Sequence, residues 1–265
     1  MASDDPIERL REAMRPWLAR HTRPAWRPVV DESDSPATGT RFGGLPWLKP
    51  GEDWPSCTTC GEPLQFFLQL DLTQLPPELN GRFGGGLLQL FYCTNDDCSA
   101  THWEAFTSGK LVRIINPNEF GDAPLPPASA PAALLPVRTI TGWRQQPDHP
   151  HPSEHEQLGV TYSFDHRKKT ARVHCPSLDI EIDGLPSFTP TSLSTALPGD
   201  KLAGWPAWVQ GVEYPPCPRC GRRMQFVFQV DSDDNVPFMF GDAGTGHVTQ
   251  CPVHTDTVTF TWACR

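Results

Sequence analysis

The sequence lacks three features that would assign it to common classes of protein. Its 265 residues contain no run of about 18 apolar residues, so no segment is predicted to span a bilayer. It has no excess of positive charge, because 22 Lys and Arg against 31 Asp and Glu give a formal charge of −9. That charge argues against binding nucleic acid through phosphate contacts. The acidic start, Met1-Ala-Ser-Asp-Asp5, predicts neither a secretory signal nor a transit peptide, and a cytoplasmic location is expected.

The chain is rich in proline and cysteine instead. Its 30 prolines remove backbone donors and favour short strands and turns over long helices. The nine cysteines are expected to be reduced in a protein without an export signal, and an odd number cannot all pair within one chain. Metal ligation is therefore the first hypothesis for these residues.

An internal repeat emerges when the sequence is compared with itself at a shift of 160 residues. Cys57 and Cys60 then match Cys217 and Cys220 without a gap. Four further positions are identical in the two copies: Gln65 and Gln225, Phe66 and Phe226, Gln69 and Gln229, and Asp71 and Asp231. The chain is therefore predicted to contain two related units, residues 41–116 and 201–265.

Each unit is predicted to be a cysteine knuckle followed by two short strands joined by a Gly-rich turn. The expected strands of the two units are 64–70, 87–92, 224–230 and 247–250. The Pro-rich connection 117–200 is expected to carry further strands at 137–143, 159–164, 170–174 and 178–182. Residues 1–40 are expected to form a linker after an amphipathic helix, which Asp5 caps and Pro16 ends or kinks. The predicted class is mainly β (α+β), with two pseudo-symmetric β-rich repeats in one compact domain and an N-terminal helix.

The spacing of the cysteines predicts two zinc sites with four ligands each. The first unit offers Cys57, Cys60, Cys93 and Cys98. The second unit offers Cys217, Cys220, Cys251 and His254. Two close pairs of this kind aim sulfur and nitrogen ligands at one tetrahedral ion, and four protein ligands leave no position open for water. Structural ions are therefore expected, with His102 as an alternative to Cys98 and Cys264 as an alternative to His254.

Other motifs favour structural interpretations. Cys175 follows His174, but neighbouring side chains on a strand point to opposite faces, so a buried thiol is expected rather than a nucleophile with its base. The segment 231–235 is expected to be a polar turn rather than a cation site. The glycines of 241–246 are expected to form a hairpin turn, because no helix pattern follows them to make a phosphate site.

Two groups of residues are candidates for binding a partner. The segment 224–264 contains aspartates but no Lys, Arg or Glu, and this acidic run favours a basic protein partner. The aspartates concerned are Asp231, Asp233, Asp234 and Asp242. Three tryptophans in Pro- and Gly-rich loops are expected to be exposed interface anchors, with core positions as the alternative: Trp47, Trp205 and Trp208. Trp103 and Trp262 lie in strand-like runs and are expected in the core.

The motifs from Arg41 to the end resemble a known family. The Pro63-Leu-Gln-Phe-Phe-Leu-Gln-Leu-Asp71 strand, Gln229-Val-Asp-Ser-Asp-Asp234 and the Phe240-Gly-Asp-Ala-Gly244 turn resemble the YwqG family of bacterial proteins. The zinc-knuckle unit is also similar to eukaryotic programmed cell death protein 2, a chaperone for a ribosomal protein. Many YwqG relatives lack cysteine pairs, so the two pairs in this chain depart toward the eukaryotic pattern. The resemblance implies two β-rich halves that bind proteins or peptides, and it supplies no catalytic residues.

The sequence therefore predicts a non-enzymatic protein with two zinc ions that binds a basic protein partner. Its role would be that of an immunity protein against a polymorphic toxin or of a dedicated chaperone. The alternative is an enzyme with a site between the two repeats, using Cys175 or a carboxylate such as Asp233 or Asp242. No membrane association is expected, and the charge of −9 makes a nucleic-acid partner the least favoured hypothesis.

Overall fold

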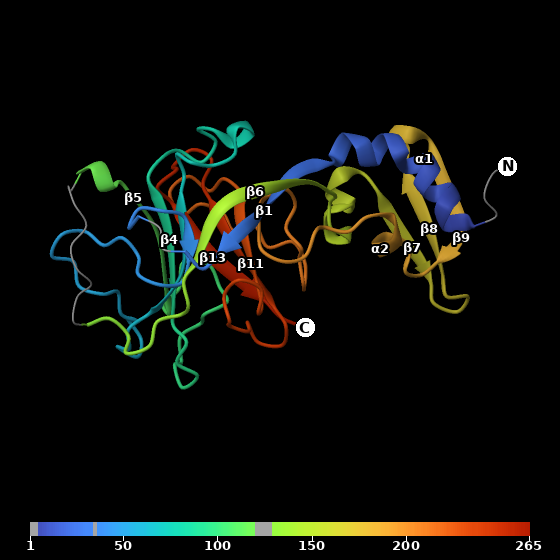
Figure 1. Cartoon of the computed structure of the whole chain (residues 1–265). Coiled ribbons are helices and arrows are strands. Elements are labelled where there is room, and N and C mark those ends of the chain that lie inside the picture. The colour runs from blue at the N-terminus through green and yellow to red at the C-terminus, as the bar shows by residue number, and fades with distance from the viewer. Residues whose placement is uncertain (1–4, 34–35, 120–128) are drawn as a thin grey trace.

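The computed structural model describes residues 5–33, 36–119 and 129–265. Ten strands of the described chain form one antiparallel sheet, and a smaller sheet of three strands lies beside the N-terminal helix (Figure 1). The predicted mainly β class is confirmed. Within the described residues, no helix is long and apolar enough to cross a membrane.

Two long strands form the centre of the large sheet, β1 (Arg23–Asp31) and β6 (Arg138–Asp148). The first repeat continues outward from β6 as β2 (Arg41–Phe42), β3 (Gln65–Asp71), β4 (Leu87–Tyr92) and β5 (Lys110–Ile115). The second repeat continues outward from β1 as β10 (Lys201–Ala203), β11 (Gln225–Asp231), β12 (Thr245–Gln250) and β13 (Val258–Ala263). Because β1 pairs with β10 and β6 with β2, β1 extends the strands of the second repeat and β6 extends those of the first.

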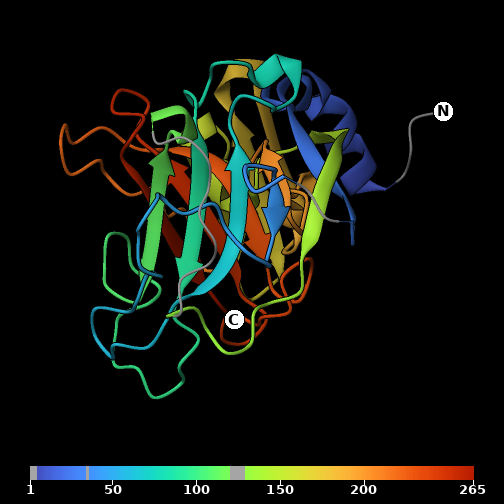
Figure 2. The same ribbon diagram turned by 60° about the vertical axis from the view of Figure 1, so that its left-hand side comes forward.

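The large sheet curls around one core that both repeats share. In Figure 2 the strands of the first repeat, green to blue, lie in front of those of the second repeat, orange to red. Aromatic contacts cross the core, with ring centroids of Phe42 and Phe228 at 5.9 Å and those of Tyr92 and Phe260 at 6.0 Å. The outermost strands β5 and β13 approach each other. The segment after β4 also meets β13, because the N–H of Trp262 donates to the carbonyl of Trp103 at 3.3 Å.

The identical glutamines explain why the two repeats fold alike. Gln69 Oε1 accepts from the N–H of Trp47 at 3.0 Å, and Gln229 Oε1 accepts from the N–H of Ala207 at 2.8 Å. Both side-chain amides also donate to loop carbonyls at matching positions, Gly39 for the first repeat and Gly199 for the second. Both glutamines are fully buried. Each one therefore satisfies backbone groups that would otherwise lose their partners inside the core.

The N-terminal helix packs on the three-stranded sheet rather than on the large one. The small sheet contains β7 (Thr161–Asp165), β8 (Thr170–Cys175) and β9 (Ile180–Pro186), and a short helix α2 (Thr189–Leu193) follows it. Helix α1 (Pro6–His21) buries Leu10, Met14 and Trp17 in a cluster with Val173 and Cys175. In the described residues, five 3-10 turns complete the elements: η1 (Pro77–Leu79), η2 (Pro117–Glu119), η3 (Pro152–Glu154), η4 (Glu156–Leu158) and η5 (Pro176–Leu178).

The helix confirms one expectation and corrects another. Asp5 is the N-cap as expected, since its carboxylate accepts from the N–H of Ile7 at 2.9 Å. Pro16 does not end the helix, because α1 continues to His21, and the alternative, a kink at Pro16, stays a prediction. Pro16 lies on the exposed face, where water can satisfy the carbonyl that loses its partner. Trp17 is buried, and its indole N–H donates to the carbonyl of Leu158 at 3.1 Å, which holds the last turns in place.

Candidate functional site

The first group of predicted metal ligands is assembled beside the strands of the first repeat. Cys57 and Cys60 lie on a loop before β3, Cys93 directly follows β4, and Cys98 lies in the next turn. Their four sulfur atoms lie within 4.8 Å of one another. The Sγ atoms are 3.7 Å apart for Cys57 and Cys98, and 3.7 Å for Cys60 and Cys93. These are the edges of a small tetrahedron of thiols.

The second group repeats this arrangement with one imidazole. Cys217 and Cys220 precede β11, Cys251 follows β12, and His254 takes the fourth position. The Sγ atoms of Cys220 and Cys251 are 3.6 Å apart, and His254 Nδ1 lies 3.8 Å from Cys217 Sγ and 3.7 Å from Cys251 Sγ. His102 and Cys264, the alternative ligands, lie outside both groups.

The knuckles have the same local structure because their backbones close on themselves in the same way. The N–H of Cys57 donates to Glu62 O at 2.8 Å, and the N–H of Gly61 donates to Cys57 O at 2.8 Å. Cys217 and Gly221 make the equivalent bonds at the same distances. Gly61 and Gly221 have φ of +79° and +71°, a conformation that glycine adopts without strain. The glycine after each second cysteine therefore has the role expected from the sequence.

Both groups fit a tetrahedral ion. Two sulfur ligands at about 2.3 Å from a zinc ion would lie about 3.8 Å apart, and the sulfur pairs in both groups approach this separation. The backbone N–H of Glu62 lowers the pKa of the Cys60 thiol to about 7, which favours the thiolate that a metal requires, whereas burial raises the pKa of the Cys93 and Cys98 thiols. Burial opposes ionisation of Cys251, but the N–H groups of His254 and Val253 lower its pKa to about 6. The two groups can therefore hold metal ions.

Arginines next to the second knuckle make contacts of their own. Arg219 pairs with Asp256 at 2.7 Å. Arg223 stacks over the ring of Tyr214 at 3.7 Å and donates to the side chains of Gln157 and Glu154. These bonds tie the second knuckle to its own loop and to the 3-10 turns that follow β6.

The tryptophans expected as exposed anchors are buried, so that expectation is wrong. Trp47, Trp205 and Trp208 expose 4% or less of their surface. The indole N–H of Trp205 donates to His21 O, and that of Trp208 donates to the Glu154 carboxylate, both at 2.8 Å. The core position expected for Trp103 is also wrong, because it is 52% exposed. Trp262 is partly buried and packs against the shared core.

The predicted acidic residues divide into two kinds. Asp231 and Asp234 hold a loop, since their carboxylates accept from the N–H of Gly199 at 2.7 Å and of Asp200 at 2.6 Å. Asp233 and Asp242 are exposed. Burial and the charge of Asp234 raise the pKa of Asp200 to about 7. Asp234 is exposed as well, and the expected role of these aspartates in binding a partner stays a prediction.

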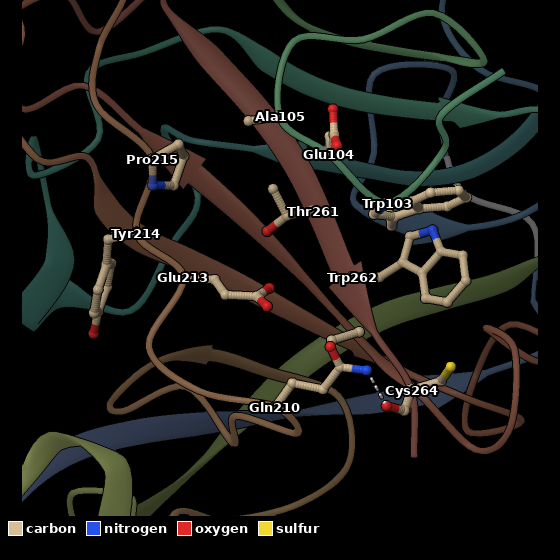
Figure 3. Close-up of a pocket in the computed structure, with 11 residues that line it drawn as sticks. Trp103, Glu104, Ala105, Gln210, Glu213, Tyr214, Pro215, Thr261, Trp262 and Cys264 are labelled. Carbon is tan, nitrogen blue, oxygen red and sulfur yellow. Dashed lines mark hydrogen bonds between the residues drawn. The ribbon is translucent and has the colours of Figure 1, made fainter.

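A pocket of about 550 Å³ lies beside the edge strand β13 (Figure 3). Its walls come from β13, the segment before the second knuckle and the turn after Cys98, and they consist of Trp103, Glu104, Ala105, Gln210, Glu213, Tyr214, Pro215, Thr261, Trp262, Ala263 and Cys264. The ring centroids of Trp103 and Trp262 are 6.3 Å apart in an edge-to-face arrangement. Gln210 closes the lower rim by donating to the carbonyl of Cys264 at 2.8 Å.

Two polar groups of this pocket, the carboxylate of Glu213 and the hydroxyl of Thr261, are candidates for binding a ligand. Burial raises the pKa of Glu213, and among the described residues no cation lies within ion-pair distance of its carboxylate. The hydroxyl of Thr261 is buried without a hydrogen-bond partner in the described part of the chain. Figure 3 shows both groups directed into the pocket. This site was not predictable from the sequence, because Glu104, Glu213 and Thr261 are separated in the chain and belong to no motif.

Comparison with known proteins places the chain in a family. Residues 40–262 match the family described as Domain of unknown function (DUF1963). The chain belongs to the DUF1963 family. YwqG-like proteins carry this domain, whereas the similarity to programmed cell death protein 2 stays a prediction. A stretch of 47 residues is 43% identical to "Uncharacterized protein YpfL" of Salmonella typhimurium (strain LT2), covering 18% of this chain and about a tenth of that protein's length.

The DUF1963 domain contains both groups of metal ligands and most of the pocket. Helix α1 and strand β1 lie before it, although β1 is a central strand of the large sheet. The matched residues therefore need the preceding segment to complete their fold.

Proposed function

We propose that this DUF1963 protein is a non-enzymatic protein that binds a basic protein partner, with zinc in its two metal groups. The observation that carries the proposal is the pocket beside β13, where the exposed Trp103 lies next to two carboxylates, Glu104 and Glu213. No Lys or Arg is among the residues that line it. A half-exposed tryptophan and the Glu213 carboxylate, which has no cation partner among the described residues, favour a positively charged protein surface.

Zinc is the metal that suits both groups best. Four thiolates, or three thiolates and one imidazole, are the usual ligands of structural zinc, and thiolates disfavour magnesium and calcium. All four positions of each tetrahedron would come from the protein, which leaves no site for an activated water. The metal would therefore stabilise the two repeats rather than perform a reaction.

This proposal allows two roles for the protein. The resemblance to the YwqG family supports either an immunity protein, whose client is a toxin, or a dedicated chaperone, whose client is a newly made basic protein. A toxin gene next to the gene of this protein would favour immunity. The residues named for an enzymatic alternative give it little support, because Cys175 is fully buried in the small unit and Asp233 and Asp242 lie outside the pocket.

The experiment that tests this proposal is tagged co-purification from the native host, with the metal content measured on the same eluate. We expect a near-stoichiometric basic protein and about two zinc ions per chain. A Trp103→Ala variant should lose the partner and keep the metal. Phe188→Ala is the matched control, because Phe188 is also an exposed aromatic, at 61%, but precedes α2 in the small unit. A partner that stays bound to Trp103→Ala, or the absence of any basic partner, would contradict the proposal.

A further inference from the structure

The register of the sheet identifies equivalent positions in the two repeats. In the first repeat Gln69 on β3 lies opposite Gln89 on β4, which lies opposite Arg113 on β5. In the second repeat Gln229 lies opposite His247, which lies opposite Thr261. Thr261 therefore occupies the place that Arg113 occupies in the first repeat.

Arg113 is the centre of a complete polar network. Its Nε donates to Gln89 Oε1 at 2.9 Å, and its two terminal nitrogens bind both carboxylate oxygens of Glu52, the second at 3.2 Å. Both side chains are largely buried, with 17% of Arg113 and 21% of Glu52 exposed. A two-pronged pair of this kind is among the stronger charge-assisted hydrogen bonds in proteins.

The second repeat has Val212 at the position of Glu52, and it lacks the guanidinium. Glu213 lies one position beyond the residue that matches Glu52, and it lines the pocket together with Thr261. His247 replaces Gln89, and burial lowers its pKa to about 3, so it is neutral and supplies no positive charge. The Glu213 carboxylate thus lies at a cavity where the first repeat has an arginine, and the buried Thr261 hydroxyl lies in the wall of that cavity without a partner among the described residues.

We propose that the pocket beside β13 receives an arginine side chain of the bound partner, whose guanidinium pairs with Glu213 and reaches the hydroxyl of Thr261. This inference rests on the proposed function, because the arginine belongs to the basic partner. Trp103 and Trp262 provide flat apolar surface for the segment that carries the arginine. The volume of about 550 Å³ admits a whole arginine side chain together with neighbouring backbone.

Arginine fits better than lysine for a geometric reason. A guanidinium has donors in a planar fork that can bind a carboxylate with two nitrogens and still offer another to a neutral oxygen. Arg113 uses its donors in this way on Glu52 and Gln89. A lysine ammonium carries the same charge without the planar fork and is more strongly hydrated.

The first test uses defined peptides and the full-length metal-loaded protein. A capped Gly-Arg-Gly tripeptide is titrated while the indole N–H signals are followed by NMR, with citrulline and lysine versions as controls. We expect the arginine peptide to bind with a dissociation constant on the order of 1 mM, at least about tenfold tighter than the citrulline peptide. Glu213→Gln should weaken binding about tenfold. The matched control is Asp53→Asn, since Asp53 is the residue that corresponds to Glu213 in the first repeat, and it should leave binding unchanged.

The second test introduces an arginine of the protein itself at the position that corresponds to Arg113. Thr261→Arg should place a guanidinium beside Glu213, fill the pocket and abolish binding of both the arginine peptide and the partner, while the metal content stays at that of the wild type. Thr261→Val, which removes only the hydroxyl, keeps the test informative if Thr261→Arg fails to fold, and it should weaken peptide binding by a smaller factor than Glu213→Gln.

The outcomes separate the two proposals. A basic partner that requires Trp103 but binds Glu213→Gln and Thr261→Arg as well as it binds the wild type would overturn the arginine site and leave the proposed function standing. Equal binding of the arginine and citrulline peptides would also overturn it. Arginine-specific, Glu213-dependent peptide binding without any basic partner in the native host would support the site and overturn the proposed function.

Discussion

The two repeats share the residues that bind and shape their own backbone, and they differ at the equivalent positions Arg113 and Thr261. Gln69 and Gln229 make the same bonds to matching loop groups, and Gly61 and Gly221 close the same knuckle. In contrast, the first repeat pairs Arg113 with Glu52, whereas the second leaves Thr261 without a partner in the described chain. The two copies thus share the residues whose loss would leave buried backbone groups without hydrogen bonds. Positions without that role can differ between the copies and form a binding site in one of them.

The metal groups show a second contrast. Cys57 and Cys93 lie in an apolar cluster with Leu48, Trp54, Leu64, Phe66 and Phe91. Cys217 and Cys251 share their cluster with Met224 alone among the described buried residues. Cys220 is exposed, whereas its counterpart Cys60 is partly buried. The second group is therefore expected to depend more on its ion and to be more open to solvent.

The largest expected effect is that of metal removal. A strong chelator should lower the midpoint of thermal unfolding by about 10 °C or more, because ligand binding to short knuckles contributes directly to folding. The metal should leave in two phases, the second group first, as measured with a colorimetric zinc indicator. Cys220→Ser should remove the fast phase and Cys60→Ser the slow one. Release in one phase, or an unchanged midpoint, would remove the contrast between the two groups.

The next effect concerns the matching basic residues that begin strands β2 and β10. Lys201 is fully buried and pairs with Asp148 at 2.9 Å, whereas its counterpart Arg41 donates to loop carbonyls such as Gly39 O. Lys201→Met should cost about 3–5 kcal/mol of unfolding free energy, because the Asp148 carboxylate would lose its buried cation. Arg41→Met should cost about 1–3 kcal/mol. Urea unfolding measures both, and equal costs would show that the two positions are energetically alike.

Smaller and nearly equal effects are expected at the shared glutamines. Gln69→Leu and Gln229→Leu should each cost about 2–3 kcal/mol, because each leaves a backbone N–H and a carbonyl unsatisfied. Gln69→Leu should cost slightly more, since Gln69 also accepts from Gln89 at 2.8 Å. Chemical unfolding of the two variants side by side is the measurement. A difference above about 2 kcal/mol would contradict the equivalence of these positions.

The smallest effect is a pH dependence carried by the second repeat. Burial lowers the pKa of His247 to about 3, below that of an unfolded histidine at about 6.5, so the unfolded chain binds the proton first. The resulting stability is present above pH 6.5 and is lost as the pH falls, by up to about 2 kcal/mol between pH 7 and pH 5. His247→Gln, which copies Gln89 of the first repeat, should reduce this loss. His155, whose burial lowers its pKa to about 4, should retain its own share. An unchanged slope in urea unfolding at the two pH values would argue against the predicted shift.

Local patterns were sufficient to predict many elements. The apolar, turn-bounded runs placed β3, β4, β11 and β12 within about two residues of their observed ends. Strand β1 was missed because Pro24 and Pro28 argue against a central strand, and it persists because it pairs with β6 along its length and bulges at Val29. The burial of Trp205 and Trp208 could not be predicted, because their partners, His21 and Glu154, lie far away in the chain.

The sequence by itself determined the two repeats, the mainly β class and the eight residues of the metal groups. These conclusions follow from the spacing of nearby residues and from the match of the sequence with itself at a shift of 160 residues. Both patterns can be recognised without knowledge of the fold. Only the tertiary structure decided that β1 and β6 lie side by side at the centre of the large sheet, that the N-terminal helix packs on the small sheet, and that Glu213, Thr261 and Trp103 line one pocket. Those relations depend on contacts between residues distant in the chain, and the side chains that make them carry no common pattern.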